Sequence, residues 1–229
     1  MKVLAILPCW NEENKIGPAV IKTKSYVNQV LVVDDYSSDN TVKEASSCGA
    51  VVLSHKKNLG VGAALKSGFE YAIKKKFDIV IIMAGDNQDN PAEIPIFLKA
   101  MKEGYDLIQG SRYLKKFDHK QPFSRKITTR LFTLFFRLVV GYPITDASNG
   151  FKAIRISLIK DLNLLKNDFD RYELEPYIII QAIRNNYKFK EVPVTKHYDL
   201  IHGYSKMKPF ISWFQICKPI IISLFKKNE

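Results

Sequence analysis

The first half of the chain alternates short apolar runs, rich in β-branched residues, with stretches whose apolar residues recur at helical spacing. The runs are expected to be strands, and they cover 2–8, 27–35, 50–56, 77–85 and 105–112. The stretches between them are expected to be helices, and they cover 12–26, 38–49, 61–76 and 90–104. Strands that alternate with helices form βαβ units, and near-continuous apolar strands are typical of a sheet covered on both faces. The pattern therefore predicts an α/β fold with a mostly parallel central sheet flanked by helices.

The second half of the chain is less regular. A basic and aromatic stretch at 124–141 is expected to be a helix, and the run 146–155 is expected to be a turn that leads into a strand. A further helix is expected at 173–187, followed by a strand at 188–198. The sequence has no internal repeat, no low-complexity tract and no linker, so 1–206 is predicted to be one domain.

The C-terminal segment, 207–229, is largely apolar but is interrupted by Lys208, Pro209, Lys218 and Pro219. It falls short of the roughly 18 consecutive apolar residues that indicate a membrane span. Two interpretations stay open. The segment is either an amphipathic helix that lies at a membrane surface or an ordinary terminal helix packed on the domain.

The formal net charge of the 229 residues is +12, and the pI is about 9.5. This bias favours an anionic partner, which means nucleic acid, a membrane surface or a phosphorylated substrate. The sequence has no zinc-finger or RNP motif, so no nucleic-acid partner is expected. Cys9, Cys48 and Cys217 lie far apart and form neither a disulfide framework nor a Cys-x-x-Cys pair, which indicates a reducing compartment. The N-terminus is expected to be a first strand, not a signal peptide.

Carboxylates stand at the ends of two of the expected strands. Asp34 and Asp35 can accept hydrogen bonds from a ribose or a base, but Asp is equally common in turns and helix caps. Asp86 offers the oxygen ligand that Mg²⁺ or Mn²⁺ prefers, and one carboxylate is enough where a diphosphate supplies other oxygens. The alternative for Asp86 is a helix cap, because Asn90 and Pro91 begin a helix shortly after it.

A glycine-rich stretch at 58–68 follows the third expected strand. It is not a Walker loop, because no Gly-Lys-Ser/Thr stands at the required spacing. Its glycines are expected to allow tight packing of a helix on the sheet, and Lys57 is expected to lie near a phosphate.

Eight segments, taken in order, resemble the glycosyltransferase family 2 enzymes. The chain is most similar to the branch that contains dolichol-phosphate mannosyltransferase and other polyprenyl-phosphate glycosyltransferases. The resemblance runs from residue 3 to about residue 208, and although each segment alone is a weak signal, the ordered set is specific. The segments are PCWNEE (8–13), VVDDYSSDNT (32–41), NLGVGAALKSGFEYA (58–72), AGDNQDNP (84–91), GSR (110–112), DASNGFKAIR (146–155), EVPV (191–194) and GYSK (203–206).

The resemblance implies a nucleotide-sugar-binding catalytic domain of the GT-A type over 1–206, with Mg²⁺ or Mn²⁺ as cofactor. Asp86 would be the metal ligand, as the surviving acid of an Asp-x-Asp motif, and Gln88 the residue that follows that motif. Arg112 would lie near the diphosphate or the acceptor, so Asp86, Gln88 and Arg112 are the expected catalytic residues. The residues expected to bind the nucleotide are Pro8, Trp10, Glu12, Asp34, Asp35 and Lys57.

The chain departs from the family pattern at two places. Ala84 stands where the first Asp of the motif is expected to face the sugar or ribose, so the metal role is retained but the donor is left open. Members of the family commonly carry an arginine shortly before the Gly-x-Ser-Lys segment, whereas this chain has leucine and isoleucine at 200–201. His197, His202 and Lys206 are the alternative groups that could serve the diphosphate.

No carboxylate is clearly placed as the general base that a hydroxyl acceptor needs. Of the candidates, Asp146 is expected to order a loop. A lipid monophosphate needs no base, because its second pKa of about 6 makes it largely a dianion at neutral pH. The candidate carboxylates are Asp146, Asp168, Asp170, Glu173 and Glu175.

A phosphate acceptor needs cations, and the run 112–130 supplies seven of them directly before an apolar helix. Arg125, Arg130 and Lys206 are expected to bind the acceptor phosphate. The alternative is a solvated charge run beside a core helix. The expected function is a metal-dependent, inverting transfer of a hexose from a GDP- or UDP-sugar to a polyprenyl or dolichyl phosphate, at the cytoplasmic face of a membrane. A family 2 enzyme acting on a glycan hydroxyl and an impaired nucleotide-sugar-binding homologue are the alternatives.

Overall fold

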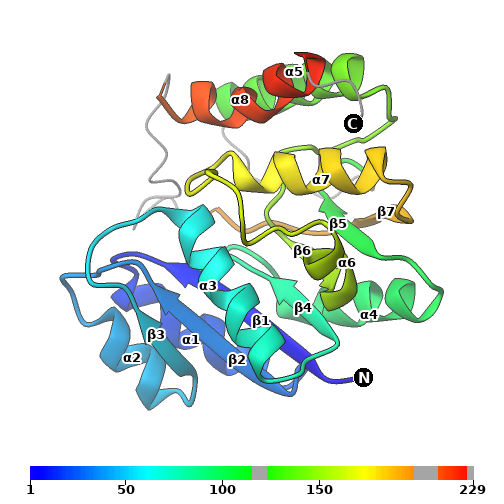
Figure 1. The fold of residues 1–229 in the computed structure, drawn as a ribbon. Coiled ribbons are helices and arrows are strands. Elements are labelled where there is room, and N and C mark those ends of the chain that lie inside the picture. The colour runs from blue at the N-terminus through cyan, green and yellow to red at the C-terminus, as the bar shows by residue number, and fades with distance from the viewer. Residues whose placement is uncertain (115–122, 199–210, 226–229) are drawn as a thin grey trace.

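A seven-stranded sheet runs through the computed structural model, which describes residues 1–114, 123–198 and 211–225 (Figure 1). The strand order is β3-β2-β1-β4-β6-β5-β7. β6 pairs antiparallel with β4 and β5, and all other neighbours pair parallel, which confirms the predicted mostly parallel sheet. The strands are β1 (Val3–Cys9), β2 (Gln29–Asp34), β3 (Val51–Ser54), β4 (Ile79–Ile82), β5 (Leu107–Ser111), β6 (Lys152–Arg155) and β7 (Phe189–Pro193).

Helices cover both faces of this sheet, as the sequence predicts. One face carries α1 (Glu13–Lys24), α2 (Thr41–Ser47) and α4 (Ile94–Lys102), and α4 follows the short 3₁₀ turn η1 (Pro91–Glu93). The other face carries α3 (Val61–Lys74), α6 (Ile156–Asp161) and α7 (Leu174–Arg184). α5 (Phe123–Val140) and α8 (Ile211–Phe225) contact each other and form a further layer beyond α7 (Figure 1).

The strands are apolar on both sides because each face has its own hydrophobic core. In β1, Leu4 and Ile6 pack toward α3, whereas Ala5 and Leu7 pack toward α1 and α4. This alternation follows from the two-residue period of a strand.

The glycines of the 58–68 stretch allow close packing, as predicted. A Cβ atom on Gly68, in α3, would lie 2.6 Å from Cγ2 of Ile6, so no larger residue fits between this helix and β1. A Cβ atom on Gly62 would lie 2.7 Å from the carbonyl oxygen of Phe169. Gly60, which precedes the helix, has a φ of 104°, a conformation that L-residues with a side chain rarely adopt.

The C-terminal helix α8 packs on the rest of the fold. Ile220 is fully buried in the core that also contains α3 and α7. Within the described residues, no helix combines the length and the hydropathy needed to cross a membrane. The division of the chain at residue 206 stays a prediction.

Candidate active site

Three loops meet at the carboxyl ends of β1, β2 and β4, the edge of an α/β sheet where ligands bind. Each loop contains a residue with a left-handed backbone: Asn11 after β1 has a φ of 53°, Tyr36 after β2 one of 69°, and Asn87 after β4 one of 57°. Such conformations are uncommon outside glycine and concentrate at functional sites. Asn11 also joins two of the loops, because its backbone N–H donates to Oγ of Ser37 at 2.8 Å.

Asp35 is buried and holds the loop that leads into α3. Its carboxylate accepts hydrogen bonds from the backbone N–H groups of Leu59 at 2.8 Å and Gly60 at 2.7 Å, and it lies 2.8 Å from Nδ1 of His55. Asp34 accepts instead from the backbone N–H of Ser37 at 3.2 Å. Both residues therefore stabilise loops, which is one of the two roles that the sequence analysis left open. Their role in nucleotide binding stays a prediction.

His55 is a residue that the sequence analysis missed. Its Nδ1 atom faces Asp35, and its Nε2 atom lies 3.0 Å from Oγ of Ser67 in α3. The imidazole therefore connects the end of β2 to α3. Lys57, two residues further along the same loop, is exposed to solvent.

Three of the residues expected at the nucleotide lie around the end of β1: Pro8 belongs to the strand, and Trp10 and Glu12 lie between it and α1. Trp10 is 43% exposed, so part of its side chain faces solvent. Pro8 and Glu12 are half-buried. The backbone N–H of Glu12 donates to Oγ1 of Thr41 at 2.7 Å, and its carboxylate lies 3.6 Å from Nζ of Lys15.

Asp86 is half-buried at the end of β4 and accepts a hydrogen bond from the backbone N–H of Gln88 at 3.1 Å. Burial raises the pKa of Asp86, and the negative charges of Asp89 and Glu12 raise it further, against the opposing effect of Lys196. The charge of Glu12 therefore acts on Asp86, and the nucleotide-binding role of Glu12 stays a prediction. Gln88 is only 2% exposed.

The described residues contain no cluster of three or more His, Cys, Asp or Glu side chains that could hold a metal ion. Asp89 does not supply a second free carboxylate beside Asp86. It is 3% exposed, lies 2.9 Å from Nζ of Lys196, and accepts from the backbone N–H of Ala84 at 3.1 Å. A divalent cation here would have Asp86 as its protein carboxylate, with water and diphosphate oxygens as further ligands.

Lys196 is a cation close to Asp86, and the sequence analysis missed it. It follows β7 and pairs with Asp89 through both a backbone bridge and its side chain. Burial alone would lower the pKa of Lys196, but the charges of Asp89 and Asp86 outweigh it and raise the pKa. Lys196 is therefore a permanent cation close to Asp86 and Arg112.

Arg112 and Asp146 form a buried ion pair, 3% and 0% exposed. Nε and Nη2 of Arg112 each donate to a different carboxylate oxygen at 2.7 Å, and Nη2 also donates to Oγ of Ser148 at 2.8 Å. Burial alone would raise the pKa of Asp146, but the charge and hydrogen bonds of Arg112 outweigh this effect and lower it. Asp146 thus orders the loop after α5, as expected, and a direct contact of Arg112 with substrate stays a prediction.

Two tyrosines link Arg112 to the arginines of α5. Nη1 of Arg112 donates to the hydroxyl of Tyr198 at 3.0 Å, and the Arg125 guanidinium lies 5.5 Å from the centroid of the Tyr198 ring. Tyr113 lies between Arg112 and Arg130, whose guanidinium groups are 5.7 and 5.4 Å from its ring centroid. We call these five residues the arginine–tyrosine wall.

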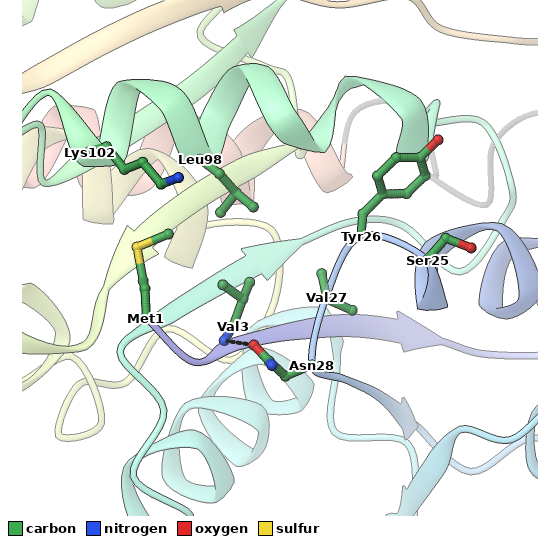
Figure 2. Close-up of a pocket in the computed structure, with 8 residues that line it drawn as sticks. All are labelled: Met1, Val3, Ser25, Tyr26, Val27, Asn28, Leu98 and Lys102. Carbon is green, nitrogen blue, oxygen red and sulfur yellow. Dashed lines mark hydrogen bonds between the residues drawn. The ribbon is translucent and has the colours of Figure 1, made fainter.

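A pocket of about 290 Å³ lies beside the arginine–tyrosine wall and is lined by Tyr113, Arg130, Thr133, Leu134, Arg137 and Thr145. A second pocket, of about 510 Å³, lies at the opposite ends of the strands, near the starts of β1 and β2 (Figure 2). There the backbone N–H of Val3 donates to Oδ1 of Asn28 at 2.7 Å. This second pocket is remote from Asp86.

Several of the remaining candidates lie outside the described residues, and two others already have partners. Lys206 and His202, together with the lysines at 115–122, lie outside the described residues. Among the candidate bases, Asp170 pairs with Lys66 at 2.8 Å, and Glu175 pairs with the buried Lys152. These two carboxylates therefore already have cationic partners.

Comparison with known proteins identifies related sequences. The family model described as glycosyl transferase family 2 matches residues 4–162. An uncharacterized protein of Methanocaldococcus jannaschii is 34% identical over 226 residues, which cover 96% of this chain and 91% of that protein. A polyprenol monophosphomannose synthase of Mycolicibacterium smegmatis is 28% identical over 203 residues, or 85% of this chain and 77% of that enzyme.

The fold is also found among solved structures. Glucosyl-3-phosphoglycerate synthase from Mycobacterium tuberculosis, in complex with Mn²⁺, UDP and glucosyl-3-phosphoglycerate, superposes with a TM-score of 0.74. The alignment covers 100% of this chain and 81% of that one at 18% identity. This likeness establishes the shared fold.

Proposed function

The chain belongs to glycosyl transferase family 2, and from this premise we propose that it transfers a hexose from a nucleoside-diphosphate sugar to a polyprenyl or dolichyl phosphate. The related Mycolicibacterium enzyme is named a polyprenol monophosphomannose synthase, which supports this acceptor class. The proposed donor is a GDP- or UDP-hexose.

The observation that carries the proposal is the arginine–tyrosine wall, whose residue Arg112 lies near Lys196. Arg112 is close enough to Lys196 to lower its pKa, and Asp86 is close enough to raise it. The wall extends from there to Arg125 and Arg130 on α5. Arginine forks suit phosphate oxygens, so a dianionic acceptor can reach the site along this wall.

The proposed reaction breaks the bond between the anomeric carbon and the diphosphate oxygen of the donor. A phosphate oxygen of the lipid attacks that carbon from the opposite side and forms the new C–O bond, with inversion. The nucleoside diphosphate leaves with the electron pair of the broken bond. Because the attacking phosphate is already largely ionised near neutral pH, the step needs no general base.

Asp86 fits a divalent cation. It is a half-buried carboxylate whose pKa is raised chiefly by burial, and a bound cation would favour the ionised form. Mg²⁺ or Mn²⁺ held there would supply Lewis-acid stabilisation of the leaving diphosphate. The Mycobacterium structure with the same fold contains Mn²⁺ and UDP, which supports this cofactor.

We assign to Lys196 the cationic role that the sequence analysis left to His197, His202 or Lys206. Lys196 is positively charged at all ordinary pH values, and its ammonium group lies against Asp89 near Asp86. It is therefore suited to stabilise the departing diphosphate. Gln88 lies in the loop after β4, two residues after Asp86, and its buried side chain is proposed to help shape the site.

The nucleotide is proposed to lie on the rim formed by the loops after β1 and β2. Trp10 offers an exposed ring for stacking, and Pro8 and Glu12 flank it. Asp34 and Asp35 fix the adjacent loops, and Lys57 is an exposed cation on one of them. Peripheral attachment at the cytoplasmic face of a membrane is proposed because the acceptor is a membrane lipid and the chain carries a net charge of +12.

A double variant tests the acceptor site. Arg125→Gln with Arg130→Gln should raise the KM for polyprenyl phosphate about tenfold or more, because each guanidinium lost is a charge-assisted contact of about 1.5–3 kcal/mol. The KM for the nucleotide sugar should stay within about twofold. Lys99→Gln with Lys102→Gln removes the same charge from α4, on the other side of the sheet, and should leave both constants unchanged. An unchanged lipid KM in the arginine variant would show that the wall does not bind the acceptor.

A further inference from the structure

α5 presents an exposed apolar stripe that the proposed reaction does not use. Its members recur at spacings of three and four residues, so they share one face of the helix. The opposite face is buried: Phe132 is 4% exposed and Phe136 is 0% exposed. The stripe consists of Phe123 (76% exposed), Ile127 (42%), Leu131 (56%), Leu134 (52%) and Leu138 (76%).

One edge of this stripe is basic. Lys126, Arg130 and Arg137 are exposed and stand four and seven residues apart, along the same side of the helix. The sequence of α5 contains no Asp or Glu, so nothing on this helix offsets their charge. Arg130 and Arg137 also line the pocket of about 290 Å³, together with the hydroxyl-bearing Tyr113, Thr133 and Thr145.

The neighbouring helix also exposes apolar side chains. α8 contacts α5 and lies beside it in the layer farthest from α1 and α2 (Figure 1). On α8, Ile221 is 40% exposed and Ile222 is 36% exposed, and the helix sequence contains no acidic residue. An apolar surface flanked by cations matches an anionic bilayer, whose acyl boundary takes apolar side chains and whose headgroups take arginine.

We infer that the outer face of α5 is the membrane-docking surface of the protein, with the stripe in the acyl boundary of an anionic bilayer and Arg130 and Arg137 at lipid phosphate groups. The inference rests on the proposed peripheral attachment and specifies the surface responsible. It also sets the orientation of the active site. The arginine–tyrosine wall begins on α5, so a lipid phosphate in that bilayer lies next to Arg125 and Arg130.

Co-sedimentation with vesicles, without donor or acceptor, tests this surface independently of catalysis. The wild-type chain should bind vesicles that contain phosphatidylglycerol and bind pure phosphatidylcholine vesicles less, with the difference reduced by salt. Leu131→Gln with Leu138→Gln should weaken binding about tenfold or more, because two exposed leucines no longer enter the acyl boundary. Arg137→Gln should weaken binding to the anionic vesicles about fivefold and leave phosphatidylcholine binding unchanged.

The matched control is Ile21→Gln with Ile96→Gln, which removes two exposed apolar side chains from α1 and α4 on the other side of the sheet. It should bind vesicles like the wild type. Equal binding by the Leu131/Leu138 variant and the control would overturn the inference. A second result would also overturn the inference. The wild type would bind no vesicles, and light scattering would show a dimer that the Leu131/Leu138 variant abolishes, because the face would then join two copies of the chain. If only the Leu131/Leu138 variant loses vesicle binding and none of the proteins transfers sugar, the result would support the docking surface and count against the proposed function.

Discussion

The buried pair of Arg112 and Asp146 should make a large and pH-dependent contribution to stability. Arg112→Met removes the guanidinium, keeps an apolar side chain of similar length, and leaves the Asp146 carboxylate at 0% exposure. Two charge-assisted hydrogen bonds of 2.7 Å are lost, each worth about 1.5–3 kcal/mol. Asp146 keeps the backbone N–H of residue 112 at 3.1 Å and the hydroxyl of Ser148 at 3.2 Å. We expect the free energy of unfolding to fall by about 3–5 kcal/mol, the cost of breaking a buried ion pair.

The sign of the pH effect follows from the pKa of Asp146. In the wild type this pKa is lowered, because Arg112 outweighs the effect of burial. A lowered pKa contributes stability above the unfolded value of about 3.9, and this contribution is lost as the pH falls through the native pKa. In the variant the opposing cation is gone, so burial raises the pKa of Asp146. Its protonation in mild acid then relieves the buried charge, and the loss of stability should be largest near pH 7 and smaller toward about pH 4.

Urea unfolding of wild type and variant at both pH values measures this effect. Arg137→Met, at an exposed position, is the control and should change the unfolding free energy by no more than about 0.5 kcal/mol. Adding Asp146→Asn to Arg112→Met removes the buried charge and should recover part of the loss. A loss below about 1 kcal/mol, or one that is the same at both pH values, would refute the assignment of this pair as a buried structural support.

Two further predictions concern the charges around β4. Asp86→Asn should abolish sugar transfer and Mn²⁺ binding while changing the unfolding free energy by less than about 1 kcal/mol, because burial already disfavours the ionised form. For the same reason, the Mn²⁺ affinity of the wild type, measured by calorimetry, should begin to fall at a higher pH than it would for a ligand Asp with the ordinary pKa of about 3.9. Full sugar transfer in EDTA would refute the metal role. Lys196→Met should lower kcat and destabilise the fold by about 3 kcal/mol, because it leaves the buried Asp89 without its cation. Adding Asp89→Asn should restore stability in urea but not kcat; if transfer returned too, Lys196 would be only structural.

The sequence predicted the main architecture because the relevant signals are local. Apolar strands and periodic helices alternate, and the glycines around α3 mark the close approach that Gly68 makes to Ile6. The position of β6 between β4 and β5, antiparallel to both, depends on contacts between distant segments. The short run Lys152–Arg155 carries no local signal for that placement.

The same distinction explains which site residues could be found. Asp86 and Arg112 end strands in the sequence, and the structure places both after the carboxyl ends of β4 and β5. Lys196 was missed because its partner Asp89 lies 107 residues away, and no short motif joins them. Asp35 illustrates a different limit, because a sequence does not show whether a carboxylate at a strand end is already satisfied by neighbouring backbone N–H groups.

The acceptor is tested most directly by comparing one lipid with and without its phosphate. The purified protein would be incubated with labelled GDP- and UDP-hexoses, Mg²⁺ or Mn²⁺, and either polyprenyl phosphate or the polyprenol of the same length. We predict that one donor gives a hexosyl lipid phosphate and an equal amount of nucleoside diphosphate with the phosphorylated lipid, and no product with the alcohol. Transfer to the polyprenol or to a free glycan hydroxyl, without transfer to the lipid phosphate, would contradict the proposed function.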